Sequence, residues 1–159
     1  NLTTNFMTLL NRMPIFPIFG NPKFVPIHVS DLVEIIYQVI LKEIKSTTIE
    51  CIGPEVISLK EILEKLLILI EKKRLLIKTP LFLAKMMAKF FQLFPKPLIT
   101  EDQLKLLSYD NVRSGRYKSN FDIGIPSQKI FIDEVRSYSY MWRDRGEFSK
   151  KKFNLDNND

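Results

Sequence analysis

Lys23-Phe-Val-Pro-Ile-His-Val-Ser-Asp31, followed at once by the apolar run from Leu32 to Ile44, is the stretch that decides the fold class. Its apolar residues at positions 24, 25, 27 and 29 predict a short strand covered on both faces, as in a parallel sheet. Ser30 and Asp31 offer oxygens to the first N–H groups of a helix, and Asp31 with Glu34 fits a capping box. Strand, capped turn and helix make half of a βαβ unit, so the sequence predicts an α/β protein with a few mostly parallel strands.

Other segments outside this stretch show similar patterns. Helical periodicity predicts helices over 3–12, 59–73, 80–94, 101–109 and 128–142. In the helix after Asp31, the same periodicity predicts a core face made of Leu32, Ile35, Ile36, Val39 and Ile40. Extended segments are predicted at 49–53 and 74–78. Residues 13–22, which contain three prolines, are expected to form a loop, and so are residues 111–125. Ser58 with Glu61, and Thr100 with Gln103, fit capping boxes.

Length and composition exclude several classes. A chain of 159 residues that is 45% hydrophobic and 26% charged suits one globular domain with a sizeable core. The net charge of +6 is modest and the lysines alternate with glutamates, which disfavours a nucleic-acid partner. Cys51 is the only cysteine and His28 the only histidine, so a disulfide is impossible and we expect no metal site. Cys51 lies between isoleucines and is expected to be buried and inert.

The ends of the chain suggest a division. The sequence has no initiating Met and opens in a helical pattern, so we expect it to be part of a longer protein. Residues 1–146 are expected to form one lobe. The charged, Asn-rich residues 147–159 are expected to be a mobile tail.

Four segments in order resemble the C-terminal half of an atypical short-chain dehydrogenase/reductase, and most closely the NAD(P)H-binding accessory subunit of respiratory complex I and its bacterial relatives. They are Asn5-Phe6 before the proline-rich loop to Gly20, the stretch from Lys23 to Asp31, Ile52-Gly-Pro-Glu55 with Ser58-Leu-Lys-Glu61, and the segment from Pro80 to Leu106. The resemblance implies the C-terminal part of a Rossmann-type fold, with a few parallel strands, a helical lobe, and the dinucleotide-binding half absent.

Two features that the active enzymes of this family need are absent from the sequence. The glycine-rich phosphate loop of the family is absent, and no tyrosine has Lys four residues later. We therefore expect no catalysis and no cofactor bound by this chain alone, with NAD(P) implied only if the missing half is present. Three hypotheses about function remain open. The chain is a non-catalytic complex I accessory-like protein with a respiratory or quinone-related role, the substrate lobe of an NAD(P)-dependent epimerase or reductase, or a degenerate remnant without activity.

Four residues are candidates for substrate binding. The resemblance suggests that Lys23 contacts a substrate phosphate, since a basic residue does so at the matching place in sugar-nucleotide epimerases. His28 is a candidate acid–base group, although a packing role is favoured. Arg113 and Arg116, in a loop around Gly115, are candidate phosphate or partner contacts.

The helix predicted over 80–94 is apolar apart from Lys85, Lys89 and Gln92. At about 22 Å it is too short to span a bilayer. Burial in the core and contact with a membrane or partner are both open, and in the second case Lys85, Lys89, Phe90 and Phe91 form the contact surface. The expected partners are the missing Rossmann half or a membrane respiratory complex. This places the protein in the cytoplasm or mitochondrial matrix, with peripheral attachment to the inner membrane.

Overall fold

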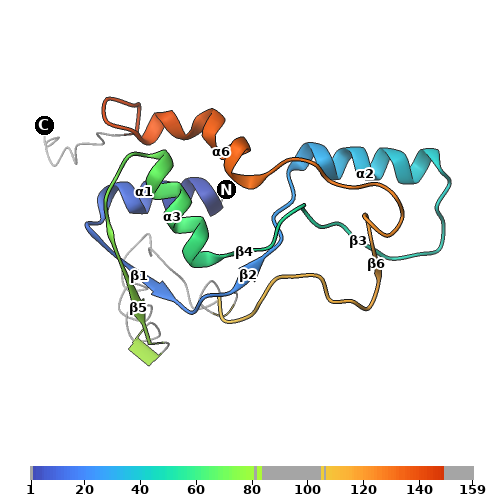
Figure 1. The fold of residues 1–159 in the computed structure, drawn as a ribbon, viewed down its shortest axis with the longest axis horizontal. Helices are drawn as coiled ribbons and strands as arrows, with labels where there is room; N and C mark the ends of the chain where they lie inside the picture. Colours follow the sequence, from blue (N-terminus) through green and yellow to red (C-terminus); the bar gives the residue numbers. More distant parts are fainter. Residues whose placement is uncertain (1, 81, 84–104, 106, 149–159) are drawn as a thin grey trace, which may run out of the picture.

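The computed structural model describes residues 2–80, 82–83, 105 and 107–148. Within this part the protein is a mixed α/β structure of four α-helices and six short strands (Figure 1). The elements in chain order are α1 (Leu2–Arg12), β1 (Ile15–Phe19), β2 (Lys23–Phe24), α2 (Val29–Leu41), β3 (Ile49–Glu50), β4 (Ile57–Ser58), α3 (Leu59–Leu69), β5 (Leu75–Thr79), β6 (Lys118–Ser119), α6 (Phe131–Ser139) and the 3-10 turn η1 (Tyr140–Trp142).

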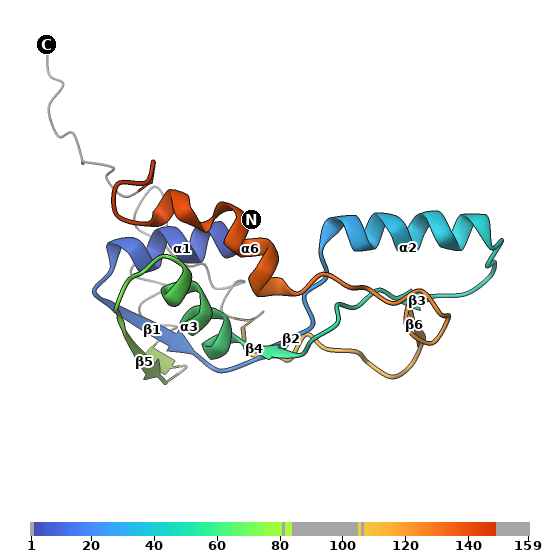
Figure 2. The same ribbon diagram turned by 45° about the horizontal axis from the view of Figure 1, so that its top comes forward.

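The elements gather in two groups. Helices α1, α3 and α6 lie together beside the β1–β5 pair, whereas α2 extends away from them above β3 and β6, in both views (Figures 1 and 2). Two strand pairs are parallel, β1 with β5 and β3 with β6, and the pair of β2 with β4 is antiparallel. The predicted α/β class with mostly parallel strands is therefore confirmed at this level.

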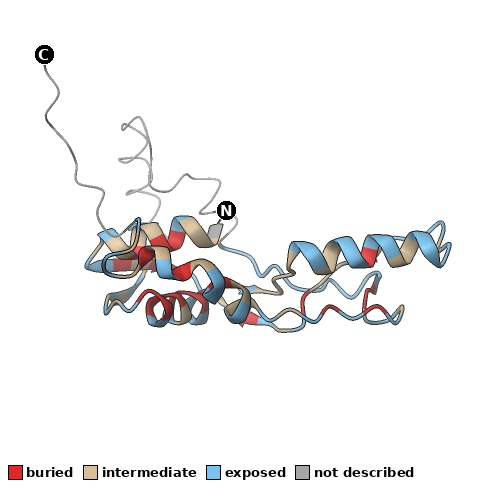
Figure 3. Cartoon of the chain, turned by 90° about the horizontal axis from the view of Figure 1, so that it is seen from above, coloured by how far each residue is buried: buried red, intermediate tan, exposed pale blue. Residues whose placement is uncertain are grey.

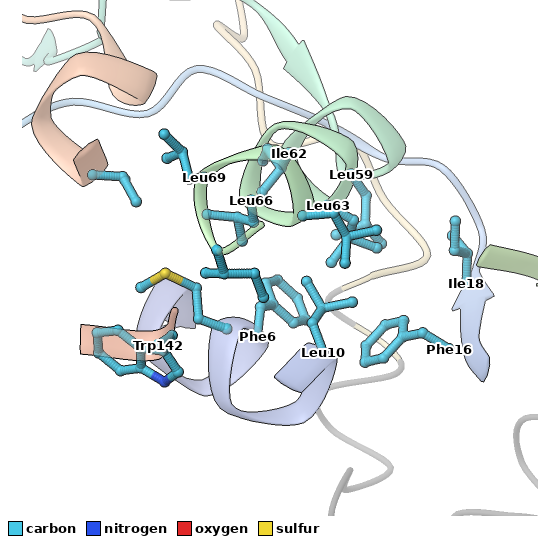
Figure 4. Packing of buried hydrophobic residues seen from close by; sticks show 14 of the residues in the cluster. Phe6, Leu10, Phe16, Ile18, Leu59, Ile62, Leu63, Leu66, Leu69 and Trp142 are labelled. Carbon is cyan, nitrogen blue, oxygen red and sulfur yellow. The ribbon is translucent and has the colours of Figure 1, made fainter. Parts of the chain in front are cut away.

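The core is built around α3. Its residues Leu63 and Leu66 are fully buried and lie in one cluster with Leu10 of α1 (Figure 4). Met7 of α1 and Val135 of α6 belong to the same cluster. Burying a side chain of this size contributes about 1.5–3 kcal/mol. Helix α3, which carries more buried apolar residues than any other described helix, therefore holds the other two helices and the β1–β5 pair together.

The start of α3 is specified locally. The Ser58 backbone N–H donates to Glu61 Oε2 at 2.8 Å, and the Glu61 N–H donates to Ser58 Oγ at 3.3 Å, which confirms the predicted capping box. The hydrogen bonds from Ser58 lower the pKa of the Glu61 carboxyl. The predicted end near residue 73 is wrong, because Ile70 caps the helix and Glu71 takes a positive φ of 56°.

The loop predicted over residues 13–22 is also wrong. Residues Ile15–Phe19 form β1, which pairs in parallel register with β5 from Ile15 opposite Leu75 to Phe19 opposite Thr79. Pro17 suggested a loop because it cannot donate to a ladder. The strand tolerates it because β1 pairs with β5 alone in the described part of the chain, and one missing donor on the other edge breaks no bond.

The turn into α2 differs from the prediction as well. The helix begins at Val29 with His28 as N-cap, and Ser30 and Asp31 lie inside its first turn. The Asp31 carboxylate accepts instead from the backbone N–H groups of Gln128 and Lys129, at 3.0 and 2.9 Å. It thus ties α2 to the segment before α6, and α6 itself begins at Phe131 rather than near 128.

Gly53 marks the closest backbone approach in this region. A Cβ on Gly53 would lie 1.7 Å from the Pro26 carbonyl oxygen, and the Gly53 N–H donates to Val25 O at 3.4 Å. Residues after β3 therefore run against the segment after β2 with no room for a side chain.

We expect Gly53→Ala to lower the free energy of unfolding by several kcal/mol, about 3 or more, because relief of the clash must move backbone. Gly115→Ala is the matched control, since its Cβ meets nothing within 4 Å and only its φ of +73° is strained. Urea denaturation measures both. Equal losses in the two variants would contradict the close packing at Gly53.

Candidate functional site

His28 occupies the N-terminus of α2 with extended backbone (φ −77°, ψ 145°). Its Nδ1 accepts from the Ser30 N–H at 3.3 Å and lies 2.8 Å from Ser30 Oγ. A ring nitrogen that accepts carries no proton, so the neutral imidazole has its proton on Nε2. An N-cap bond of this kind contributes about 0.5–2 kcal/mol to helix stability.

The other face of His28 meets α6. Nε2 lies 3.4 Å from Glu134 Oε2, and Lys129 Nζ lies 3.3 Å from Glu134 Oε1. The side chains of His28 and Glu134 are 34% and 32% exposed, so their attraction is screened by water and is worth about 0–1 kcal/mol. The carboxylate is shared between two partners, which holds the start of α2 beside the start of α6.

These groups border a cavity of about 350 Å³, which we call the His28 pocket. Its lining combines five apolar side chains with four titratable ones and a threonine: Thr3, Pro26, Ile27, His28, Val29, Lys129, Phe131, Glu134, Val135 and Tyr138. Burial raises the pKa of Tyr138, opposed by a hydrogen bond with Thr3, so the hydroxyl stays protonated at neutral pH. The pocket offers an imidazole, a carboxylate, an ammonium and a phenol, a set able to bind a small polar molecule.

Sequence reasoning found one titratable member of this pocket, His28, and missed three. Lys129, Glu134 and Tyr138 come from a segment about a hundred residues later, and no motif joins them to His28. The one readable signal was that Glu134 and Tyr138 are four apart on a helix and therefore share a face.

Lys23 lies elsewhere. Its backbone N–H donates to Asp110 Oδ1 at 2.8 Å, while its side chain is exposed. It adjoins a hollow of about 440 Å³ beside the carboxyl ends of β1 and β5, which Gly20, Thr79 and Asp110 help to line. Ligands of open α/β sheets bind at such ends. The structure does not bring Lys23 and His28 into one cavity.

Arg113 is held within its own loop. It pairs with the Asp122 carboxylate and lies 4.0 Å from Glu50 Oε2, while Glu50 also accepts from the Ser114 N–H at 3.1 Å. These bonds give Arg113 a structural role in the 111–125 loop. Arg116 is exposed and does not line the His28 pocket.

The outer face of α2 is the third feature of interest, and we call it the α2 stripe. It comprises Val29, Val33, Ile36, Tyr37, Ile40 and Leu41, which are between 51% and 71% exposed (Figure 3). At 100° per residue they lie on one side of the helix. Ile36 and Ile40 were predicted in the core, which is wrong: only Ile35 of α2 is buried.

The remaining predicted residues lie outside the part that the structure describes. These are Lys85, Lys89, Phe90 and Phe91, together with the capping box at Thr100. None of the described helices combines the length and apolar character needed to cross a membrane. The described residues also contain no group of three His, Cys, Asp or Glu side chains placed to hold a metal ion. Cys51 is partly buried, and desolvation raises the pKa of its thiol.

Comparison with known proteins adds no relative. No protein-family model matches the chain, and no curated protein matches it.

The contacts of Asp122 lead us to expect that the stability of the 111–125 loop depends on pH. Hydrogen bonds from Ser119 lower the pKa of Asp122, with a further contribution from Arg113. A carboxyl with a lowered folded pKa stabilises the protein above its ordinary titration range and loses that contribution as pH falls through the lowered value. We expect acid to loosen the 111–125 loop in the wild type and to change Asp122→Asn less.

Amide hydrogen exchange of Ser119 and Asn120 at a series of acidic pH values measures this. Asp133→Asn, at an exposed aspartate of α6, is the control and should titrate like the wild type. An Asp122→Asn profile identical to that of the wild type would contradict the assignment.

Proposed function

We propose that this chain is the C-terminal, non-catalytic lobe of a Rossmann-type, NAD(P)-binding protein of the atypical short-chain dehydrogenase/reductase kind. In this proposal it acts as an accessory component with a respiratory-complex or quinone-related role. Its dinucleotide-binding half is supplied separately and docks on the α2 stripe. The observation that carries the proposal is the uncovered apolar face of α2, which lies beside the short parallel pair of β3 and β6 (Figure 1).

The described part of the chain covers helix α2 on one side and leaves another side exposed. Leu32, Ile35 and Val39 lie on a side that the rest of the chain covers at least partly, whereas the α2 stripe faces outward. A helix that is apolar on two sides is typical of the interior of a larger structure. Single exposed hydrophobic residues need no explanation, but six on one side of a helix mark an interaction surface.

The free energy gained by covering the α2 stripe is large enough to support a stable contact. Covering each large side chain fully contributes about 1.5–3 kcal/mol, and every member of the α2 stripe is at least half exposed. The stripe spans more than 100° of the helix, which is wider than the two-position seam of a coiled coil. A broad, β-branched face of this kind fits the face of a sheet, as in the layers of α/β proteins.

A lipid surface fits this face less well. Residues 29–45 carry three acidic side chains, Asp31, Glu34 and Glu43, against two lysines, Lys42 and Lys45. Helices that lie on anionic membranes carry mainly Lys and Arg on their polar side. The charge around the α2 stripe therefore favours a protein partner.

The described residues do not fit a dinucleotide by themselves. A pyrophosphate is normally held by a glycine-rich turn at a helix N-terminus. Here α2 begins with His28 and α3 with Ser58, and both sites use a side chain to cap the backbone. No chemical step is assigned to NAD(P) on this chain.

A second candidate is the substrate lobe of an NAD(P)-dependent epimerase or reductase. The observation that favours it is the His28 pocket, where Lys129, Glu134 and Tyr138 supply polar groups around a small cavity. In that case the dinucleotide half would bring the hydride chemistry and this lobe would bind the substrate. The third hypothesis is a remnant without activity. It would be favoured if the chain neither associated through the α2 stripe nor bound a small molecule in the His28 pocket.

We expect the chain alone to bind NADPH more weakly than about 10 μM, because a tighter Kd needs roughly −7 kcal/mol from residues that lack a phosphate loop. Fluorescence titration of NADPH measures it, with an intact short-chain dehydrogenase as positive control. Saturable binding below that concentration would overturn the division into a docking lobe and a separate dinucleotide half.

The α2 stripe gives a second test. Without a partner, the wild type should self-associate at neutral pH, because apolar surface that lacks its cover pairs with itself. We expect Ile36→Glu/Ile40→Glu to shift the protein toward the monomer by light scattering. Ile68→Glu is the matched control, since Ile68 is 76% exposed on α3 and should leave the mass distribution unchanged.

A sharp monomer peak for the wild type with a cooperative thermal transition would contradict the docking proposal. Equal shifts in the stripe variant and the Ile68 variant would mean that general charge, and not the α2 stripe, controls association.

A further inference from the structure

We propose that His28 is a pH-sensitive latch on the α2 stripe: protonation of its imidazole removes the N-cap of α2 and weakens the helix that carries the docking face. This regulation rests on the proposed function for what docks. The change in α2 itself rests only on the contacts of His28 and can be measured without a partner.

The latch follows from the two ring nitrogens. Nδ1 accepts from the Ser30 N–H at 3.3 Å, which requires a lone pair. A protonated imidazole has a hydrogen on both nitrogens, so it cannot accept this bond. The one contact that Nδ1 can keep is donation to Ser30 Oγ, 2.8 Å away. Histidine is also the side-chain type that gains charge between about pH 8 and pH 5.

The charged and titratable groups near His28 lie on α6, in the segment before α6 and on α2 itself. On α6 these are Glu134, at 3.4 Å from Nε2, and the protonated Tyr138 hydroxyl in the same pocket. Lys129, in the segment before α6, repels an imidazolium, and Asp31 on α2 is committed to the backbone of that same segment.

Glu134 is the one group whose attraction opposes the loss of the cap. It is already paired with Lys129 at 3.3 Å and is about one-third exposed, which screens the gain from a charged His28. The partial positive charge of the α2 N-terminus also disfavours a cation at this position. Loss of the cap therefore outweighs the ion pair, and acid weakens the first turn of α2.

The stripe begins in that turn. Val29 is its first member and Val33 lies one turn later. The first backbone bond of the helix runs from the Leu32 N–H to His28 O at 3.1 Å. A loosened first turn no longer holds Val29 and Val33 in place at the start of the stripe. Docking on the stripe is therefore weaker.

The test is amide hydrogen exchange by NMR on the full chain, at about pH 7.5 and about pH 5.5, with rates corrected for intrinsic exchange. In the wild type, protection of Leu32 and Val33 should fall by roughly 2- to 30-fold, the range for loss of one N-cap. Helix α3, capped by Ser58 and not by a histidine, is the internal reference and should keep its protection.

Two variants sharpen the result. His28→Asn keeps a side-chain acceptor that does not titrate, so its α2 protection should be the same at both pH values. Ser30→Ala removes the last acceptor for a protonated Nδ1, so its fall should exceed that of the wild type. Unchanged α3 protection verifies that each variant is folded. A flat wild-type profile, or the same fall in His28→Asn, would overturn the latch.

Light scattering at the same two pH values connects the latch to docking. We expect self-association of the wild type to decrease at the lower pH and that of His28→Asn to persist. If the exchange data show the latch while Ile36→Glu/Ile40→Glu associates like the wild type, the docking proposal fails and the pH response of α2 stands. If the stripe variant dissociates but exchange is flat, the latch fails alone.

Discussion

The structure depends on the need to cover the apolar surface of α3. Leu63 and Leu66 lie in one buried cluster with residues of α1 and α6, and no other described helix carries as many buried residues. Because the free energy of burial scales with area, a helix with this many apolar residues needs several covering layers. Its capping box fixes where it starts, and the β1–β5 pair and the neighbouring helices take their places from it.

Helix α2 has the same need to cover its apolar surface, but the described part of the chain does not meet it. It is as apolar as a core helix, yet Ile35 is its one buried residue. Because α2 is no less apolar than α3, the difference in burial comes from what surrounds each helix. The α2 stripe and the His28 pocket meet at one residue, because the histidine that caps α2 also contacts Glu134 of α6.

Local signals in the sequence predicted the elements better than their contacts. The Ser58–Glu61 capping box and the extended segment after Arg74 were readable because each depends on residues close in the chain. The end of α3 and the strand β1 were not, since a positive φ at Glu71 and an edge position for Pro17 are set by tertiary context. The His28 pocket was predictable in only one residue, because its other groups come from α1, α6 and the segment before α6.

A hydrogen bond joins α1 to η1, two elements that are far apart in the sequence. The Trp142 indole N–H donates to Thr8 Oγ1 at 3.0 Å, although the two residues are 134 positions apart in the sequence, and Trp142 stacks on Phe148 with ring centroids 4.8 Å apart. The first helix of the chain is therefore completed by one of its last elements. Contacts of such separation close slowly because the entropy of a long loop is lost before they form. During synthesis α3 can cover Met7 and Leu10 early, but the part of α1 that Trp142 covers stays exposed until η1 has left the ribosome.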